Sequence, residues 1–296
     1  MRVPPHAAAE AFVAACLAEL DAPKPGNVHR FAPGHGMKTD DFVLSAEVSA
    51  APLTEAGARV GARVLNAVGA TLAAVGQNTN LGILLLCAPL AAAVEREEGG
   101  LRDALAATLN DLNRDDATAV FAAIVAANPG GLGASARHDV RAPAEVTLLE
   151  AMAEAADRDR IARQYATVYE DVFTVGLAAL GEARKRRTGQ SWATLAVYLG
   201  YLATAPDTHV ARKLGIGAAE AIRREAAPWR TALEAAADPN ELLDGLLEWD
   251  ASLKARGLNP GATADLTVAT LFAESLQILR GDETKGSILP WSAKND

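Results

Sequence analysis

Residues 54–76, TEAGARVGARVLNAVGATLAAVG, carry one apolar stripe with the period of an α-helix. The stripe is made of residues spaced three or four apart: Val60, Val64, Val68, Leu72 and Val75. Side chains at this spacing share one helical face, whereas a half-buried strand would alternate apolar and polar residues. No stretch of the sequence shows that alternation. The pattern therefore predicts an all-α fold.

The helical period continues along the rest of the chain. Phe12, Cys16 and Leu20 recur every fourth residue, and an apolar run follows the acidic pair Asp40-Asp41. Further helices are expected at residues 83–94, 101–109, 116–128, 147–156, 159–186, 190–202, 218–227, 240–256 and 262–279. The breaks are short and carry Gly, Pro, Asn or Asp, and there is no fixed-period repeat. We expect a single compact multi-helix domain over residues 1–280, followed by a C-terminal tail at 281–296.

The composition narrows the class of protein. Half of the 296 residues are hydrophobic but only 5% are aromatic, so a large core must be built mainly from Ala, Leu and Val. The formal charge of −9 argues against nucleic acid or an anionic membrane as a general partner, because both favour a positive surface. Any site for phosphate must therefore be locally basic.

The cysteines and the apolar runs suggest a cytoplasmic protein. Cys16 and Cys87 lie in apolar runs without metal-ligand spacing, which is typical of buried hydrophobic residues. Glu10 and Glu19 interrupt the first apolar stretch, so no signal peptide is expected. The longest apolar run, 81–94, is short for a bilayer and contains proline. A reducing cytoplasm is the consistent location.

The most unusual polar segment is PKPGNVHR at residues 23–30. Two prolines and a glycine fix a non-helical loop, and its polar side chains are Lys24, Asn27, His29 and Arg30. Asp40-Asp41 follows soon after. A metal-bound polyphosphate needs this mixture, because carboxylates bind the cation while basic groups bind the phosphates. A surface loop with solvated charges would give the same pattern.

Two further segments begin apolar helices with polar residues that include asparagine. They are GQNTNLG at 76–82, which contains Asn78, Thr79 and Asn80, and LNPGATADL at 258–266, which contains Asn259 and Asp265. A short side-chain oxygen at a helix start accepts the free backbone N–H groups of the first turn. Capping accounts for one of these asparagines, not for all of them.

Together the three segments resemble the triphosphoribosyl-dephospho-CoA synthase family, the enzymes that build the prosthetic-group precursor of citrate lyase and malonate decarboxylase. The family signature is a Pro-Lys-Pro-Gly loop that leads through a histidine and acidic residues to a Phe-x-x-Ser helix. It continues with Asn-Thr-x-x-Gly and, near the C-terminus, Pro-Gly-x-x-Ala-Asp-Leu. The matching residues here, in the same order, are Pro23 to Gly26, His35, Asp40, Phe42, Ser45, Asn78, Thr79, Gly82, Pro260, Gly261, Ala264, Asp265 and Leu266.

The chain departs from the family pattern at two places. Asn80-Leu81 stands where the citrate-lyase enzymes carry His-Lys. Gly36-Met37-Lys38 follows the histidine in place of Asp-Met-Asp, with the acids displaced to Asp40 and Asp41. A cation lost at one phosphate-facing position and gained at another indicates an altered substrate with the reaction type retained.

The resemblance implies that the base of ATP is released and that the triphosphoribosyl unit passes to a ribose hydroxyl of dephospho-CoA. Reaction at the anomeric carbon passes through an oxocarbenium-like state, so a carboxylate can stabilise charge and an acid can protonate the leaving adenine. The catalytic candidates are His35, Asp40, Asp41 and Asp265, with His35 or His29 for proton transfer. The three aspartates are also the candidate ligands of Mg2+, the expected metal.

The remaining candidates would bind the substrates. Those for phosphate oxygens are Lys24, Arg30, Arg212 and Lys213. Those for ribose or base edges are Asn27, Asn78, Asn80 and Asn259, and the others near the nucleotide are His29, Ser45, Thr79, Asp207 and Gly261. We expect the Pro-Lys-Pro-Gly loop and the two helix starts to meet at one cleft. Loss of the Lys24 side chain is expected to weaken triphosphate binding and to spare the fold.

Three polar elements remain open to two interpretations. Asp207, which precedes Thr208-His209, is either a helix cap or part of an element that faces a triphosphate together with Arg212-Lys213. His138 is either a base or a hydrogen-bonded loop histidine. Asp115-Asp116 is mostly a helix-start pair that suits the helix dipole.

Two alternative functions also remain open. One is a related phosphoribosyl transfer onto another cofactor precursor, such as a methanopterin-type one-carbon carrier, from another phosphorylated ribose donor. The other is a non-catalytic nucleotide-binding helical protein. The sequence has no GxxxxGK[ST], GxGxxG, HExxH or GxSxG motif, so P-loop, dinucleotide-fold, zinc and hydrolase-elbow sites are unsupported. It leaves the acceptor, the anomeric outcome and the choice between monomer and homodimer open.

Overall fold

The computed structural model describes residues 3–34, 36–97, 99–130, 133 and 137–282. In these residues the chain is all-α, as predicted, and the only strand-like pairings are two isolated bridges. The elements are α1 (Pro5–Leu20), α2 (Thr39–Leu53), α3 (Val60–Val75), α4 (Leu81–Ala93), α5 (Leu101–Asn110), α6 (Arg114–Ala127), α7 (Leu148–Ala155), α8 (Arg160–Ala166), η1 (Val172–Gly176), α9 (Leu177–Lys185), α10 (Gln190–Thr204), α11 (Thr208–Leu214), α12 (Ile216–Ala235), η2 (Pro239–Leu242), α13 (Leu243–Ala255) and α14 (Gly261–Arg280).

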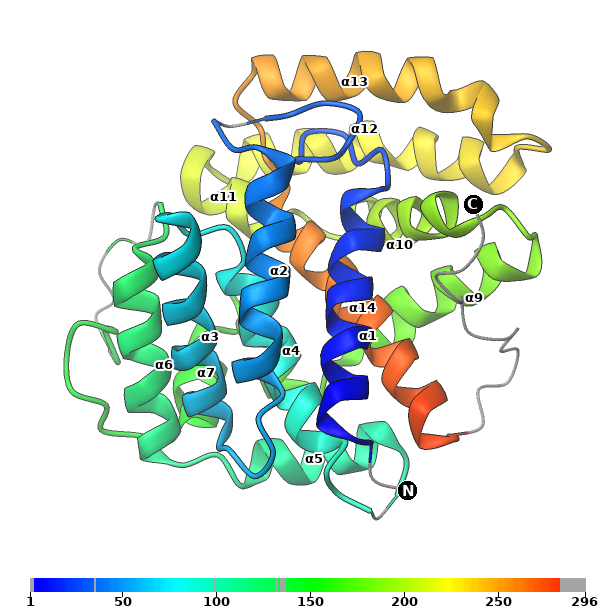
Figure 1. Ribbon diagram of the computed structural model, residues 1–296. Helices are drawn as coiled ribbons and strands as arrows, with labels where there is room; N and C mark the ends of the chain where they lie inside the picture. Colours follow the sequence, from blue (N-terminus) through cyan, green and yellow to red (C-terminus); the bar gives the residue numbers. More distant parts are fainter. Residues whose placement is uncertain (1–2, 35, 98, 131–132, 134–136, 283–296) are drawn as a thin grey trace.

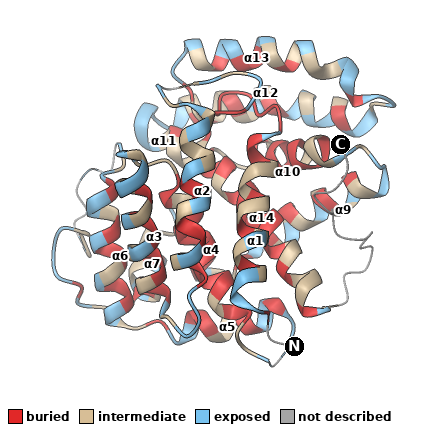
Figure 2. Ribbon diagram, in the orientation of Figure 1, coloured by how far each residue is buried: buried red, intermediate tan, exposed pale blue. Residues whose placement is uncertain are grey.

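Helix α14 lies at the centre of the molecule and packs against α1, α4 and α10 (Figure 1). Its residues from Leu266 to Ala273 are all buried, and Figure 2 shows α4 and α14 as the most continuously buried helices. Phe12 of α1 meets Phe272 of α14 edge to face, with ring centroids 5.8 Å apart. The start of α14 is therefore held by the core and can position side chains with precision.

The apolar stripe of residues 54–76 forms α3, which starts at Val60. Val60, Val64 and Val68 are buried against the core, as predicted. Asp116, at the start of α6, accepts a 2.9 Å hydrogen bond from the Gly61 backbone N–H and so joins α6 to α3. Asp115-Asp116 is thus a structural pair, because Asn113 caps both of its N–H groups.

The long helix expected at 159–186 is broken into α8, the π-helical turn η1 and α9. The cause is tertiary. Pro89 in α4 has no N–H to donate to the Leu85 carbonyl, and the Tyr165 hydroxyl donates there instead at 2.6 Å. Tyr169 donates to the next carbonyl, that of Leu86, at 2.8 Å. To reach it, the backbone adopts positive φ at Val168 and Tyr169, which ends α8.

A second apolar cluster joins α10, α11, α12 and α13 around Tyr198, Leu199 and Leu253. Trp229 and Trp249 stack within it, with ring centroids 6.0 Å apart. This cluster places α13 over the Pro-Lys-Pro-Gly loop (Figure 1). In the described part of the chain, no helix is both long and apolar enough to cross a membrane. The proposed tail beyond residue 282 lies outside the described residues.

Candidate active site

A cavity of about 1050 Å3 lies among the starts of α4, α11 and α14 and the helices α6, α7 and α8. Its volume is at the upper end of the range for small-molecule sites. The loop at 23–30 contributes Asn27, the start of α4 contributes Asn78, and the start of α14 contributes Asn259 and Asp265. The three segments singled out from the sequence thus line one cavity. The other predicted residues that line it are Thr79, Arg212 and Gly261.

Asp265 is a carboxyl group of the cavity that the fold leaves available to a ligand. Among the described residues, no hydrogen bond or salt bridge engages its side chain. Burial raises its pKa well above the usual range, and the neighbouring carboxylates of Asp207, Glu19 and Asp159 raise it further. Of the groups that shift the pKa of Asp265 most strongly, only Arg212 lowers it and so favours the carboxylate. A positively charged ligand in the cavity would stabilise this carboxylate.

The glycine of the Asn-Thr-x-x-Gly segment makes room for Asp265. A Cβ atom at Gly82 would overlap the Asp265 carboxylate, and it would also lie 2.8 Å from the side chain of Ile161. The first turn of α4 therefore approaches both α14 and α8 closely. This contact explains why glycine stands at that position.

Asparagine side chains fasten the loop to the start of α14 and cap the start of α4. The Asn27 amide donates to Asn259 Oδ1 at 2.8 Å, which fastens the loop to the segment before α14. Asn78 Oδ1 accepts from the Leu81 N–H at 3.1 Å and so caps α4. Asn80, in contrast, is buried, points to Ser49 at 3.3 Å and does not line the cavity.

Arginines at and just before the start of the helix expected at 159–186 also line the cavity. They are Arg158, Arg160 and Arg163, and Arg137 joins them from the preceding loop. The signal was present in the sequence, because residues 157–163 read DRDRIAR. Three cations in seven residues beside a helix start favour a phosphate site more than the interior of a helix.

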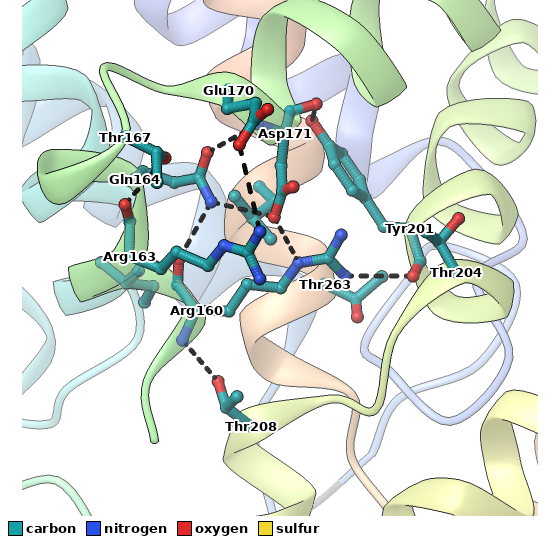
Figure 3. A network of polar contacts seen from close by, with 12 residues as sticks. Arg160, Arg163, Gln164, Thr167, Glu170, Asp171, Tyr201, Thr204, Thr208 and Thr263 are labelled. Carbon is teal, nitrogen blue, oxygen red and sulfur yellow. Dashed lines mark hydrogen bonds and ion pairs between the residues drawn. The ribbon is translucent and has the colours of Figure 1, made fainter. Parts of the chain in front are cut away.

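Arg160 is fixed in place by its neighbours (Figure 3). Its guanidinium donates to Asp171 at 2.8 Å and to the Tyr201 carbonyl at 3.1 Å, and lies 5.0 Å from the centre of the Tyr201 ring. Its backbone N–H donates to the Thr208 hydroxyl at 3.2 Å, which links α8 to α11. Arg160 therefore forms a rigid wall of the cavity.

His209 is another cavity residue that is absent from the candidates predicted from the sequence. Its ring lines the cavity and packs against the first residue of α14, because a Cβ at Gly261 would lie 3.2 Å from it. Nδ1 lies 3.4 Å from the Arg212 guanidinium. His138 lines the cavity as well. In the sequence, the feature that could have indicated a functional role for His209 was its position between Asp207 and Arg212.

Asp207 fastens two helix starts together and does not line the cavity. Its carboxylate accepts from the Val210 N–H at 2.9 Å and from both the N–H and the hydroxyl of Thr263 at 2.8 Å. Burial raises its pKa despite these hydrogen bonds. Both carboxylate oxygens of Asp207 already accept hydrogen bonds from the protein. Asp207 therefore has a structural role in place of the expected contact with substrate.

The cations of the loop at 23–30 do not line the cavity. Lys24 is fully buried and its ammonium contacts Glu19 at 2.5 Å, the Val28 carbonyl at 2.7 Å and Asn27 at 3.3 Å. Arg30 is half exposed and pairs with Asp21. The expected phosphate contacts are thus taken by protein groups.

Asp250 of α13 explains why the loop has this conformation. Its carboxylate accepts from the Gly26 N–H and from Lys254, both at 2.8 Å, and lies 3.4 Å from His29 Nε2. Gly26 has φ of 83°, and a side chain there would lie 2.9 Å from Pro260. Burial lowers the pKa of His29, which is enclosed and outside the cavity lining.

The remaining predicted residues also lie outside the lining. Asp41 accepts from the Lys38 N–H at 3.1 Å and from Gln77 at 3.2 Å, so it belongs to the start of α2, and Asp40 beside it is exposed. Ser45 touches the cavity indirectly through a 2.6 Å hydrogen bond with Thr79. Lys213 lies near Gly130 on the surface. His35 lies outside the described residues.

The expected metal ligands do not come together. Asp265 lines the cavity, whereas Asp40 and Asp41 do not. Among the residues that the structure describes, no group of three or more His, Cys, Asp or Glu side chains could hold a metal ion. A metal site built only from protein ligands therefore has no support in the described residues.

The comparisons agree with the resemblance noted in the sequence. The family model described as ATP:dephospho-CoA triphosphoribosyl transferase matches residues 5–284. A crystal structure from Archaeoglobus fulgidus, assigned as a triphosphoribosyl-dephospho-CoA synthase, matches with a TM-score of 0.60 and 24% identity, over 80% of this chain and 98% of that one. This similarity shows that the two chains share a fold. No curated protein matches the chain. Neither alternative function is favoured by these findings.

Proposed function

The chain belongs to the ATP:dephospho-CoA triphosphoribosyl transferase family, and we propose that the cavity beside Asp265 is where it transfers the triphosphoribosyl group of ATP to dephospho-CoA. One observation carries the proposal: the three signature segments and a set of arginines line the same cavity. The volume of about 1050 Å3 is enough for more than one drug-sized ligand, which a two-substrate transfer requires.

The reaction breaks the bond between adenine and C1′ of the ATP ribose and forms a bond from C1′ to an acceptor hydroxyl oxygen. The hydroxyl proton must reach the departing adenine, so the products are neutral adenine and the triphosphoribosylated acceptor. Positive charge develops at C1′ in the oxocarbenium-like state. Asp265 would stabilise this charge; its place in the cavity lining and the absence of a hydrogen bond or salt bridge to it among the described residues support the role.

Basic side chains at the cavity would hold the triphosphate. Arg158 from the segment before α8, Arg163 from α8 and Arg212 from α11 face the same space. Guanidinium groups bind phosphate oxygens in bidentate fashion, which fixes orientation as well as charge. Arg160 would act differently, since its hydrogen bonds to Asp171 and the Tyr201 carbonyl keep it in the wall.

His209 is our candidate for moving the proton from the acceptor hydroxyl to adenine. It replaces His29, which is enclosed by the loop and α13 and does not line the cavity. An imidazole can accept and release a proton near neutral pH. Its ring lies beside Gly261, on the helix that carries Asp265. The proton carrier and the charge-stabilising carboxylate thus come from adjacent parts of the site.

We propose that Mg2+ enters with ATP. Mg2+ commonly keeps several waters and binds through one or two carboxylates together with substrate phosphates, so a cluster of three protein ligands is not required. Asp265 is the one predicted ligand that fits, because its carboxylate lines the cavity and has no protein partner among the described residues. When bound, the ion would neutralise charge on the triphosphate.

The substitution Asp265→Asn tests the proposal. The amide is nearly isosteric but uncharged, so adenine release from ATP should fall by about a hundredfold or more. The raised pKa means that ionised Asp265 costs folding free energy above its unfolded pKa, so the melting temperature at neutral pH should stay the same or rise. Full turnover, or an early melt, would contradict the assigned role.

Asp157→Asn is the matched control. Asp157 also lines the cavity, but it is exposed to solvent. Loss of this charge should change adenine release by less than about threefold, since solvent-exposed charges contribute little. A similar loss in both variants would indicate a general effect of negative charge on the cavity.

A further inference from the structure

The cavity has two parts with different chemistry. One part, the charged lobe, is lined by side chains from the 137–139 loop, α8, α11 and α14, among them Arg137, Arg163, Arg212 and Asp265. The other part, the apolar lobe, is lined from α4, α6 and α7 by Leu85, Val120, Phe121, Ile124, Leu148 and Met152. Together they form one continuous site.

The apolar lobe is uniform in character. Every residue of α4 and α6 that lines the cavity is apolar or glycine. On α7 the single charged lining residue is Glu154, in the last turn, where it lies 3.5 Å from Arg137 of the charged lobe. Phosphate or ribose in the apolar lobe would lose water without gaining hydrogen bonds from these side chains.

The two substrates differ in one part that suits such a surface. ATP consists of a base, a ribose and phosphates. Dephospho-CoA has the same kind of nucleotide end and, in addition, a long pantetheine arm rich in methyl and methylene groups. We propose that the apolar lobe binds the pantetheine arm of dephospho-CoA, an inference that rests on the proposed function. The nucleotide end of the acceptor then enters the charged lobe, where its ribose meets C1′ of ATP.

The adenine ring is a poorer occupant of this lobe. Its ring nitrogens and amino group have fixed directions in one plane, and unpaired buried polar groups cost binding free energy. The lining side chains of α4 and α6 offer no partner for them. The amides of the pantetheine arm are separated by flexible methylene groups and can turn toward the open side of the cavity.

The substitution Ala151→Phe fills the apolar lobe and tests the assignment. Ala151 lines the cavity from α7, whereas Ala153 is exposed on the other face of the same helix. Ala153→Phe is therefore the matched control. Adenine release would be measured for both variants with ATP as donor, and with either dephospho-CoA or ADP as acceptor. ADP keeps the nucleotide end of dephospho-CoA and lacks the arm.

We expect Ala151→Phe to raise the KM for dephospho-CoA by about tenfold or more, since overpacking a filled site is costly. The KM for ATP and the turnover with ADP should match the wild type, and Ala153→Phe should match it throughout. A rise in the KM for ATP would assign the lobe to the donor and overturn the inference. Equal losses with both acceptors would also overturn it.

A measurement on the wild type covers the case in which Ala151→Phe fails to fold. By calorimetry, dephospho-CoA should bind at least about tenfold more tightly than ADP and with a more negative heat-capacity change, because the arm buries apolar surface. Equal affinities would overturn the inference while leaving the proposed transfer intact. A wild type that releases no adenine with either acceptor would instead overturn the proposed function itself.

Discussion

Two segments of the chain carry cations at a similar density, and the fold uses them in opposite ways. In the loop at 23–30, Lys24 is buried against Glu19 and Arg30 is paired with Asp21. In the segment at 157–163, Arg158 and Arg163 line the cavity. The cations of the loop serve the structure, whereas Arg158 and Arg163 of the second segment belong to the binding surface.

The difference teaches that the availability of a cation to a ligand depends on how strongly the fold engages its charged group, as Lys24 and Arg163 show. The ammonium of Lys24 has three protein oxygens around it, which together satisfy its three N–H donors. The guanidinium of Arg163 has one distant carboxylate, that of Glu170 at 4.0 Å, on an exposed surface. Composition alone does not distinguish these two situations.

The largest effect that would test this comparison is expected for Lys24→Ala. Removal of the ammonium leaves the buried carboxylate of Glu19 unpaired, which should cost about 3–5 kcal/mol of the free energy of unfolding. Denaturant unfolding at neutral pH measures it. The double variant Lys24→Met with Glu19→Leu should recover most of the stability, because an apolar pair of similar volume carries no desolvation cost. A fully stable Lys24→Ala chain would restore the loop as a candidate phosphate site.

A smaller effect, on binding, is expected for Arg212→Ala. A charge-assisted contact to phosphate contributes about 1.5–3 kcal/mol, so the KM for ATP should rise by roughly ten- to a hundredfold with little change in stability. Lys213→Ala is the matched control, since the neighbouring side chain lies near Gly130 and does not line the cavity. If both variants weakened ATP binding equally, the effect would be one of net charge and not of the site.

The smallest effect is expected for Arg30→Ala. Arg30 and Asp21 are each about half exposed, with side-chain exposures of 49% and 47%. Exposed ion pairs contribute less than about 1 kcal/mol, so the melting temperature and the kinetics of adenine release should both stay close to those of the wild type. A large rise in the KM for ATP would show that the loop binds phosphate after all.

Much of the fold follows from local sequence. The stripe from Val60 to Val75 forms a helix as predicted, and the helix expected at 147–156 is α7, with Thr147 as its cap. The helix expected at 116–128 begins at Arg114 instead, because Asn113 and not the Asp115-Asp116 pair is its cap. The break after α8 did not follow, because it depends on Tyr169 reaching a carbonyl of α4 that lies 83 residues earlier. Periodicity records which face is apolar and carries no information on such distant partners.

The candidate site shows the same division. Asn27, Asn78, Asn259 and Asp265 were found from the sequence because each stands in a segment with more polar groups than capping explains. His209 and the arginines of α8 were missed, since a cap and a solvated helix face accounted for them equally well. Their placement depends on how α8 and α11 meet, through the hydrogen bond from the Arg160 N–H to Thr208.

The sequence by itself determined an all-α chain, the starts of most helices and the three segments that supply the family signature, because these depend on the local period and on nearby hydrogen bonds. Only the tertiary structure decided which charges face a ligand. Asp250 reaches Gly26 across 224 residues of sequence and Asp207 reaches Thr263 across 56, and these contacts settle which side chains are buried. The free energy of a charge depends on its distance from water and from an opposite charge, and both are set by the packing of distant helices.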